Sequence, residues 1–571
     1  MPDLDLWQCF LIELGVLAIA LLCTRWKTWQ RWMSALEPRL QSLAQRPQLC
    51  FWAIFTIAVV WRLVLLPLQP VPRPLFHDEF SYLLGADTFM HARLTNPTPP
   101  VPLALETIHA NMWPTYQSMY MPGPALLLAL GQRLGSPWIA VLLATALFPA
   151  VLYWAFSAWV PRSFALVASG IALGITGSMN WWFDNYFCLA LSCLGTTLVL
   201  GSLPRISRSP VQQPGWTATW PLSLGLIFLL LTRPYEGFCI VFPCILVLVW
   251  YLRRMGWPRV LNMAAFPSAT LSLTVCWLLY CNWRGTGHAL LFPYMLNFRL
   301  YHITGPFLFS AKHPIPSYNN GMLRRFYPFA ELPQFDFMRA HPLLFLAKKI
   351  SIYYASVLLG FGLLAVTGLV YLARHASQRL FMAPLLAFAG FAFNVLLMAW
   401  APFPQYAAPA APLLYLLAIF GIFWLAQGQS PFPGGRKLVH GLVLAELMLG
   451  LSCFGYRISA GRDFPEPQYV SKDRARVADE VSGHPGKQLC LVRYTATHDG
   501  WQEWIFNGAD PENARLVWAR SLNPKTDQQV IAAYPGRQVW LVTPDVANSL
   551  LQPYSPTTPF PPRDREPPSP D

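Results

Sequence analysis

Charged residues are scarce in this sequence: Asp, Glu, Lys and Arg make up only 12% of its 571 residues, against roughly 25% in soluble globular domains. This scarcity excludes an ordinary soluble enzyme, and the 54% of hydrophobic residues indicates a polytopic membrane protein. The cysteines form no framework either. Ten of the eleven lie in or beside apolar runs, and only Cys490 lies elsewhere. We therefore expect no disulfide-stapled domain, and interpret the cysteines as small packing residues.

Apolar runs long enough to cross a bilayer, about 20 residues each, recur along most of the chain. They predict about twelve membrane-spanning helices, at 9–24, 50–68, 137–158, 164–183, 185–203, 218–233, 236–252, 259–281, 351–372, 381–399, 406–425 and 437–456. The first run is preceded by no Lys or Arg and followed by no small-residue cleavage site. We therefore expect a retained span there and not a signal peptide.

The net charge of +14 would suggest a nucleic-acid partner in a soluble protein, but here the cations lie in alternate loops between the apolar runs. One set of loops holds fifteen Lys and Arg residues, whereas the short loops of the other set hold only Arg233. The positive-inside rule makes the first set cytoplasmic. We therefore expect no nucleic acid, an integral inner (plasma) membrane protein, and external (periplasmic) loops 69–136 and 282–350.

The sequence pattern changes after residue 456. The runs "QLCLVRY" and "RQVWLVTP" are typical of strands and "PKTDQQVIAAY" of a helix, which predicts a small external α/β module over 457–552. The proline-rich tail 553–571 is expected to be disordered. The expected fold is thus an all-α domain of about 11–12 transmembrane helices over 50–456, preceded by a span and a basic segment at 1–49 and followed by the soluble α/β module.

The stretch "PLFHDEFSYLLGADTFM" places two acids beside a histidine, directly after an apolar run. His77, Asp78 and Glu79 begin an amphipathic helix that we expect to lie along the membrane surface. One interpretation is structural, with Asp78 capping the helix and Glu79 in its first turn. The other is chemical, because a carboxylate at this boundary can accept a proton from a hydroxyl group.

Other polar residues near the outer ends of spans each have two interpretations. Asp184 lies at a tight turn, as a second catalytic acid or as a turn residue. Arg233 either binds an anion or pairs with Glu236. Arg62, inside a span, either faces a cavity and pairs with an acid or a lipid phosphate, or extends to the interface.

The junction "PFPQYAAPAAP" contributes Gln405 and Tyr406, either as substrate-binding residues or as a proline-bent helix entry with an interfacial tyrosine. Two acids with one or two arginines at a lipid boundary suit a reaction between a lipid-borne phosphate and a hydroxyl.

These motifs together resemble the GT-C superfamily of integral-membrane glycosyltransferases, especially protein O-mannosyltransferases and lipid A aminoarabinose transferases. The Asp-Glu pair after the first core span is similar to the superfamily's acidic signature. "YMPGPALLLALG" resembles a Tyr-x-Pro-Pro segment, "WWFDNYF" a second acidic site, "LLLTRP" a Leu-Thr-Lys-Gly step and "QYAAPAAP" a His-Tyr-x-x-Pro element. The resemblance covers roughly residues 45–425, and the order of the motifs makes it fairly specific.

The resemblance implies an inverting hexosyl- or pentosyltransferase of the cell envelope that uses a dolichyl- or polyprenyl-phosphate sugar, with a glycan, lipid or protein as the acceptor and membrane lipids as partners. It implies catalytic roles for Asp78, Glu79 and Asp184. The donor phosphate would meet Arg233 and Arg62. The substrates would contact His77, Tyr82, Tyr120, Gln405 and Tyr406. Met121 and Gly123 depart from the Lys and the second Pro of the aminoarabinose enzymes, and leave the acceptor open.

Two further questions stay open at this level. No tight ligand spacing specifies a metal, so the cofactor is unknown, with a divalent cation as the candidate. Trp501 and Trp504 of the module either stack on a sugar or belong to its core. The competing function is a multispan transporter or flippase of lipid-linked glycans, for which internal repeats and charges near the bilayer centre would be expected.

Overall fold

The computed structural model describes residues 5–177, 183–210, 213–399, 403–427, 434–459, 472–495, 497–546 and 550–557. The chain divides into two compact units. The helical unit comprises Met1–Pro72, Leu134–Cys276 and Met338–Pro465. The loop-and-tail unit comprises Arg73–Arg133, Trp277–Phe337 and Glu466–Asp571. The two long loops thus group with the C-terminal segment, whereas their sequence position suggested that they belong to the helical domain.

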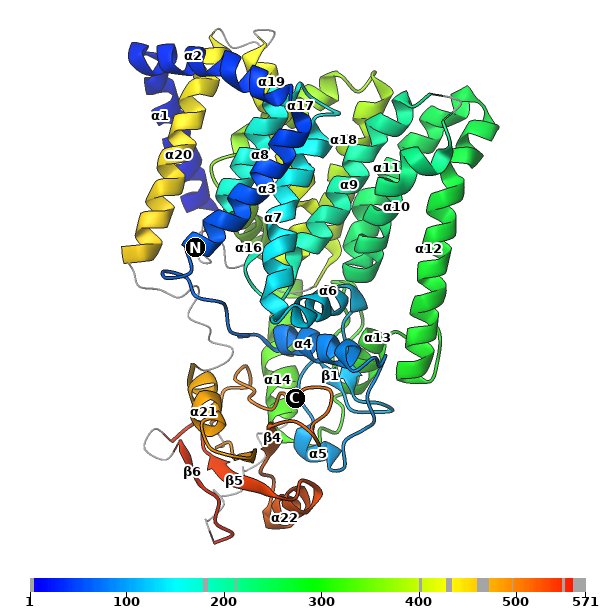
Figure 1. The fold of residues 1–571 in the computed structure, drawn as a ribbon, viewed down its shortest axis with the longest axis vertical. Helices are drawn as coiled ribbons and strands as arrows, with labels where there is room; N and C mark the ends of the chain where they lie inside the picture. The colour runs from blue at the N-terminus through cyan, green and yellow to red at the C-terminus, as the bar shows by residue number, and fades with distance from the viewer. Residues whose placement is uncertain are drawn as a thin grey trace. The chain divides into compact units, whose positions relative to one another are not determined.

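The helical unit consists of packed helices (Figure 1). They are α1 (Leu6–Thr24), α2 (Lys27–Ala44), α3 (Pro47–Val64), α7 (Pro137–Phe156), α8 (Arg162–Gly177), α9 (Leu189–Arg208), α10 (Gly215–Thr232), α11 (Pro234–Leu252), α12 (Trp257–Thr286, which runs on into the second unit), α16 (Pro342–Tyr353), α17 (Gly362–Arg374), α18 (Met382–Leu397), α19 (Ala411–Ala426) and α20 (Gly435–Ser459). Short helical turns are η2 (Arg253–Met255), η4 (Tyr354–Leu358), η5 (Arg379–Phe381), η6 (Pro404–Tyr406) and η7 (Ala408–Ala410).

In the described part of the chain, ten helices are long and apolar enough to cross a membrane, or eleven if the bent pair of α16 and α17 counts as one span. Helix α8 is apolar but shorter, and the predicted span to which it belongs runs on into residues outside the described ranges. These helices confirm the expected polytopic all-α class, and they identify an integral membrane protein.

Helices α9 and α19 form the centre of this unit, since 94% of the residues in the apolar stretch of each helix are buried. Helix α17 packs closely on α19 because small residues line their contact: a Cβ atom on Gly368 would lie 1.8 Å from the Leu417 carbonyl oxygen, and one on Gly421 would lie 2.2 Å from that of Leu364. Glycine is therefore required at both positions.

One predicted span is not straight. The run 351–372 was expected to form a single helix, but α16 and α17 meet at an angle of 95°, so this prediction was wrong. Gly360 adopts φ 86° at the bend, and the Glu13 side chain of α1 accepts the backbone N–H of Gly362 at 2.6 Å. The carboxylate satisfies a backbone donor that the broken helix would leave unpaired in lipid.

The loop-and-tail unit mixes short helices with two small sheets (Figure 1). Its helices are α4 (His77–Met90), α5 (Pro102–Leu105), α6 (Pro122–Arg133), α13 (Pro293–Tyr301), α14 (Gly321–Phe326), the turn η3 (Tyr327–Glu331), α15 (Leu332–Ala340), α21 (Lys472–Ser482) and α22 (Pro524–Ala533). Its strands are β1 (Ala110–Asn111), β2 (Gln117–Ser118), β3 (Lys487–Val492), β4 (Leu516–Arg520), β5 (Arg537–Val542) and β6 (Leu551–Pro553).

The larger sheet has the order β4-β3-β5-β6, with β3 parallel to β4 and β5, and β6 antiparallel to β5. This confirms the expected α/β module. Pro553 pairs with Trp540 in this sheet, so the folded module reaches further than the predicted boundary at residue 552. The predicted disordered tail from residue 558 onwards lies outside the described residues.

A single hydrophobic core joins the module to the first long loop. Leu84, Leu105 and Tyr116 pack in one buried cluster with Leu489 and Val517 of the sheet. Burial of these side chains, worth about 1.5–3 kcal/mol each, explains why the loop and the C-terminal segment form one unit.

Candidate functional site

Helix α4 begins with the acidic stretch, and its start is fixed by Glu79. The Glu79 carboxylate is fully buried, and its Oε2 accepts the backbone N–H groups of Leu75 at 2.8 Å and Phe76 at 3.0 Å. Phe76 is the residue that precedes the first helical turn. The interpretation that Asp78 caps the helix was therefore wrong: Glu79 does so from the third helical position, and the Asp78 carboxylate is directed elsewhere.

Asp78 meets Tyr120 and His109. The Tyr120 hydroxyl donates to Asp78 Oδ1, and His109 Nδ1 lies 3.2 Å from the Tyr120 oxygen and 3.8 Å from Asp78 Oδ2. A tyrosine hydroxyl has one proton, and Tyr120 uses it in the hydrogen bond to the Asp78 carboxylate. His109 must therefore donate its Nδ1–H to the tyrosine oxygen, which fixes its tautomer.

The Asp78 carboxylate keeps an open side. Its side chain is 23% exposed, and Oδ2 accepts no hydrogen bond from the described residues. Tyr82 stacks on Tyr120 with ring centres 4.5 Å apart, which holds the tyrosine in place. The cluster thus has one carboxylate oxygen positioned by protein and one available to a substrate.

His109 is held in an uncommon state. Its φ is 62°, in the left-handed region that non-glycine residues rarely adopt, at a cost of order 1–3 kcal/mol. Its carbonyl oxygen accepts the Ser81 hydroxyl at 2.7 Å. Burial lowers the pKa of His109 to about 3, so the imidazole is neutral at physiological pH and donates one proton without adding charge beside Asp78.

The C-terminal module reaches the same cluster through His77. His77 Nε2 donates to the Trp501 carbonyl oxygen at 2.7 Å, and the two rings are stacked at 6.3 Å. Phe506 stacks on Phe80 at 4.1 Å. Trp501 is partly exposed, whereas Trp504 is fully buried. The core interpretation therefore holds for Trp504, and the sugar-stacking interpretation stays a prediction for Trp501.

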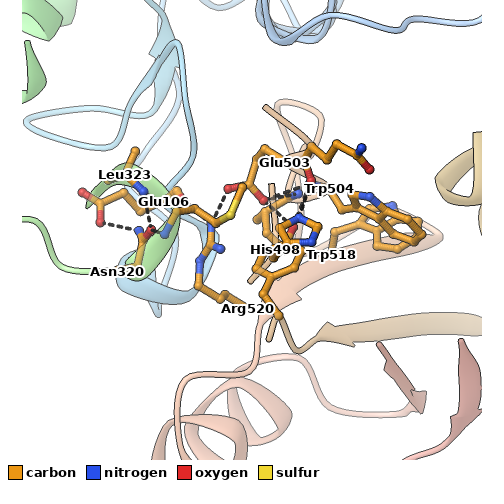
Figure 2. A network of polar contacts seen from close by, with 12 residues as sticks. Glu106, Asn320, Leu323, His498, Glu503, Trp504, Trp518 and Arg520 are labelled. Carbon is orange, nitrogen blue, oxygen red and sulfur yellow. Dashed lines mark hydrogen bonds and ion pairs between the residues drawn. The ribbon is translucent and has the colours of Figure 1, made fainter. Parts of the chain in front are cut away.

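A buried polar network fixes this arrangement (Figure 2). Arg520 of β4 forms an ion pair with Glu503 at 2.5 Å and donates to the Glu106 backbone oxygen at 3.2 Å. The fully buried Glu106 carboxylate accepts from Tyr301 at 2.9 Å and Asn320 at 3.2 Å. Burial raises the pKa of Glu106. The network connects both long loops to the C-terminal module through hydrogen bonds and one ion pair, and so holds the loop that carries His109 in place.

In the helical unit, Asp184 is paired with Arg62. Arg62 Nε and Nη2 donate to Asp184 Oδ2 at 3.0 and 2.7 Å, and Nη1 donates to the Gln69 carbonyl oxygen at 2.9 Å. The indole N–H of Trp138 donates to Asp184 Oδ1 at 2.9 Å. The side chains of Arg62 and Asp184 are 8% and 10% exposed. Both groups are thus largely occupied by protein partners.

Arg233 and Tyr406 form the second cluster of the helical unit. Arg233 precedes α11, its guanidinium carbon lies 5.0 Å from the Tyr406 ring centre, and its Nη1 is 3.6 Å from Glu236 Oε1. The 3.6 Å separation makes this a loose ion pair. Gln405 is buried, and its Oε1 has no hydrogen-bond partner among the described residues. Arg233 and Tyr406 are therefore neighbours in space, and Gln405 precedes Tyr406 in the sequence.

A divalent cation would need several His, Cys or carboxylate ligands around one point. Within the described ranges no three such side chains gather in that way. Asp78 and His109 supply only two. The side chains as placed do not form a metal site, and no step below is assigned to a metal.

The sequence offered His109 only as one of several external residues that could join the acids in a metal site, and not as a partner of Tyr120. His109 lies 31 positions after Asp78, and its contact with Tyr120 depends on the β1–β2 hairpin that follows it. The proximity of Trp501 to His77, across more than 400 residues, likewise had no local signal.

The sequence matches no protein-family model, and no curated protein matches it. Solved structures do match. The Archaeoglobus fulgidus oligosaccharyltransferase in complex with zinc and sulfate has a TM-score of 0.50 at 11% identity, over 86% of this chain and 67% of that chain. The same enzyme tethered to an acceptor peptide gives 0.49 at 10% identity over 86% and 68%. Its complex with an inhibitory peptide and a dolichol-phosphate gives 0.48 at 10% identity over 86% and 69%.

At 11% identity the zinc and sulfate complex establishes likeness of fold and nothing finer. The chain therefore has a fold similar to that of the archaeal oligosaccharyltransferase.

Proposed function

We propose that this protein is a membrane glycosyltransferase that moves a sugar from a polyprenyl- or dolichyl-phosphate to an acceptor hydroxyl. The observation that carries the proposal is the Asp78 carboxylate, which has one oxygen held by Tyr120 and the other open. This geometry suits a general base, because the open oxygen can receive a proton while the other remains fixed. The fold similarity supports the proposal.

In the proposed reaction the acceptor hydroxyl gives its proton to Asp78 Oδ2 as its oxygen attacks the anomeric carbon. The bond between that carbon and the phosphate oxygen breaks, and the polyprenyl phosphate leaves with the bonding electrons. Attack and departure on opposite faces of the sugar invert its configuration. Tyr120 and His109 are positioning residues in this scheme, since they hold the carboxylate and leave its charge intact.

We assign the departing phosphate to Arg233. A guanidinium group can bind two phosphate oxygens at once, and Arg233 stands at the start of α11. The Tyr406 ring under the guanidinium restricts its direction. Gln405 could supply a further polar contact to the donor.

We assign Arg62 and Asp184 to positioning, in place of the phosphate-binding and catalytic roles that the resemblance implies. Their mutual hydrogen bonds and those from Gln69 and Trp138 support this assignment, because a buried charge that is already paired is costly to free. His77 and Glu79 likewise support Asp78, and Tyr82 acts through Tyr120.

The membrane orientation follows from the charge pattern of the loops. We propose that the Asp78 cluster and the C-terminal module are external, as the positive-inside rule predicts. The acceptor class, whether glycan, lipid or protein, is open in this proposal, as is the sugar.

The decisive experiment reconstitutes the purified protein in liposomes with a panel of polyprenyl-phosphate sugars and an envelope extract as the acceptor source. We expect acceptor-dependent release of polyprenyl phosphate together with a sugar-bearing product. The same assay with and without a chelator tests whether the reaction requires a metal. Movement of the intact donor between leaflets without cleavage would instead establish a flippase and refute the proposal.

A further inference from the structure

A shallow apolar groove lies between α11 and α18. It has a volume of about 210 Å³ and is lined by Leu246, Val247, Trp250 and Met382. Leu246 is 52% exposed on this face. A groove of this composition beside membrane helices suits a hydrocarbon chain, because three of the four lining side chains carry no hydrogen-bonding N–H or O–H group.

Two arginines converge on Trp250 at the end of this groove. The guanidinium carbon of Arg254, from η2, lies 4.8 Å from the indole centre, and that of Arg379, from η5, lies 5.4 Å from the same centre. Each guanidinium group is stabilised by a cation–π contact with the Trp250 ring, but the two positive charges lie near each other and repel.

These two cations have no acidic partner in the described part of the chain. Neither forms an ion pair with a described residue, and the sequence has no Asp or Glu between 240 and 262 or between 366 and 400. Arg254 is exposed and Arg379 is partly buried, so both guanidinium groups are accessible from outside the protein. Two arginines that contact the same indole ring, with no carboxylate to neutralise them, therefore favour the binding of an anion.

The groove is distinct from the proposed donor site. Arg233 precedes α11 and Arg254 follows it, and the 19 residues of the helix separate these ends by about 28 Å, close to the hydrocarbon thickness of a bilayer. Trp250 and its arginines thus mark the other membrane interface, where tryptophan and basic residues contact headgroups.

We propose that this groove is a binding site for an anionic glycerophospholipid, with the phosphate between Arg254 and Arg379 and one acyl chain along Leu246 and Val247. Charge complementarity favours an anionic over a zwitterionic lipid, and the apolar groove favours a lipid over a free phosphate. Basic recesses between membrane helices bind such headgroups in general. The site is independent of the proposed transferase reaction.

The test measures the thermal unfolding midpoint of the full-length protein in a neutral detergent during titration with phosphatidylglycerol. A ligand that binds the folded protein raises this midpoint. We expect a rise with phosphatidylglycerol, a much smaller one with phosphatidylcholine of the same chains, and none with inorganic phosphate. In the Arg254→Ala/Arg379→Ala double variant the apparent dissociation constant for phosphatidylglycerol should increase about tenfold or more.

A matched control removes two exposed arginines of α2, as Arg31→Ala/Arg39→Ala, and should leave the response unchanged. Leu246→Trp keeps both cations but fills the groove, so it should also abolish the response, and it decides the question if the double arginine variant fails to fold. Equal responses to the two lipids, a full response to inorganic phosphate, or an unaltered response in both groove variants would each overturn the proposal.

Discussion

The change Asp78→Asn separates chemistry from folding at the acidic cluster. The substitution is isosteric, and an Asn oxygen can still accept the Tyr120 hydroxyl that Asp78 Oδ1 accepts. The helix start is held by Glu79, so it is not disturbed. The main structural loss is one negative charge in the first turn of α4, worth 0.3–1 kcal/mol. We therefore expect the free energy of unfolding to fall by about 1 kcal/mol at most.

The effect on transfer should be much larger. Loss of a positioned general base typically slows a reaction on the order of 10²- to 10⁴-fold, which corresponds to roughly 2.7–5.4 kcal/mol of activation free energy. His109 cannot replace the base efficiently, because burial lowers its pKa to about 3. The predicted loss of rate thus exceeds the predicted loss of stability several-fold in free energy.

The assay follows sugar transfer by purified protein from a polyprenyl-phosphate donor, with folding checked by thermal unfolding and gel filtration. The matched control is Asp87→Asn on the same helix, since Asp87 accepts the Ala509 backbone N–H and is remote from the Tyr120 hydroxyl. We expect its turnover to stay within a few-fold of wild type. Turnover by folded Asp78→Asn protein at the level of this control would refute the catalytic role of Asp78.

Three further predictions test other parts of the site. Arg233→Ala should raise the apparent KM for the donor at least tenfold, and Arg233→Lys should restore part of the affinity, because charge survives without the two-pronged contact; an unchanged KM in both would place Arg233 outside the donor site. Burial lowers the pKa of His109 to about 3, so at mildly acidic pH the unfolded chain binds a proton at this residue that the folded chain excludes. The contribution of His109 to the free energy of unfolding is therefore full above about pH 6.5 and declines towards pH 3. His109→Gln should flatten this decline in unfolding midpoints measured between pH 7 and 5, and an identical pH profile would contradict the assignment. Glu503→Gln should cost about 3–5 kcal/mol by leaving Arg520 buried without its partner, whereas Asp473→Asn, in an exposed pair with Arg476, should cost less than about 1 kcal/mol in the same denaturation assay.

Much of the fold was predictable because the apolar runs are a local property of the sequence. A run of about 20 apolar residues must form a helix in lipid whatever its neighbours are, and helices such as α9 and α19 appear where they were expected. The bend between α16 and α17 was not predictable in this way. It depends on the side chain of Glu13 in α1, which no local pattern connects to Gly362.

The candidate site was predictable to a similar extent and for a similar reason. Asp78, Glu79 and Tyr120 carry recognisable local motifs, and the structure brings Asp78 and Tyr120 into contact. The division of labour between the two adjacent acids was not visible, because it depends on which way each side chain of α4 points. His109 and Trp501 join the cluster through the tertiary structure of the loop-and-tail unit, which sequence spacing does not encode.

The pair of Arg62 and Asp184 offers a test between a positioning role and direct contact with substrate. Both side chains are about nine-tenths buried, so removal of either partner should cost about 3–5 kcal/mol of unfolding free energy by leaving a buried charge unpaired. The double variant Arg62→Ala/Asp184→Ala should lose less than the sum of the single losses, with a coupling of about 0.5–3 kcal/mol. Denaturation of the three variants measures this cycle, and additive losses would show that the pair is not coupled.

The kinetics of the same variants then decide the role. A positioning pair predicts that the folded fraction of Arg62→Ala binds the donor with an unchanged apparent KM and a reduced kcat, because the guanidinium acts through Asp184, Gln69 and the end of α3. Direct phosphate binding by Arg62 predicts the opposite, a KM raised at least tenfold, as for Arg233→Ala. Since Arg62 is held in a buried ion pair with Asp184, we expect the two arginines to differ in this respect, and equal increases in KM would overturn the distinction between them.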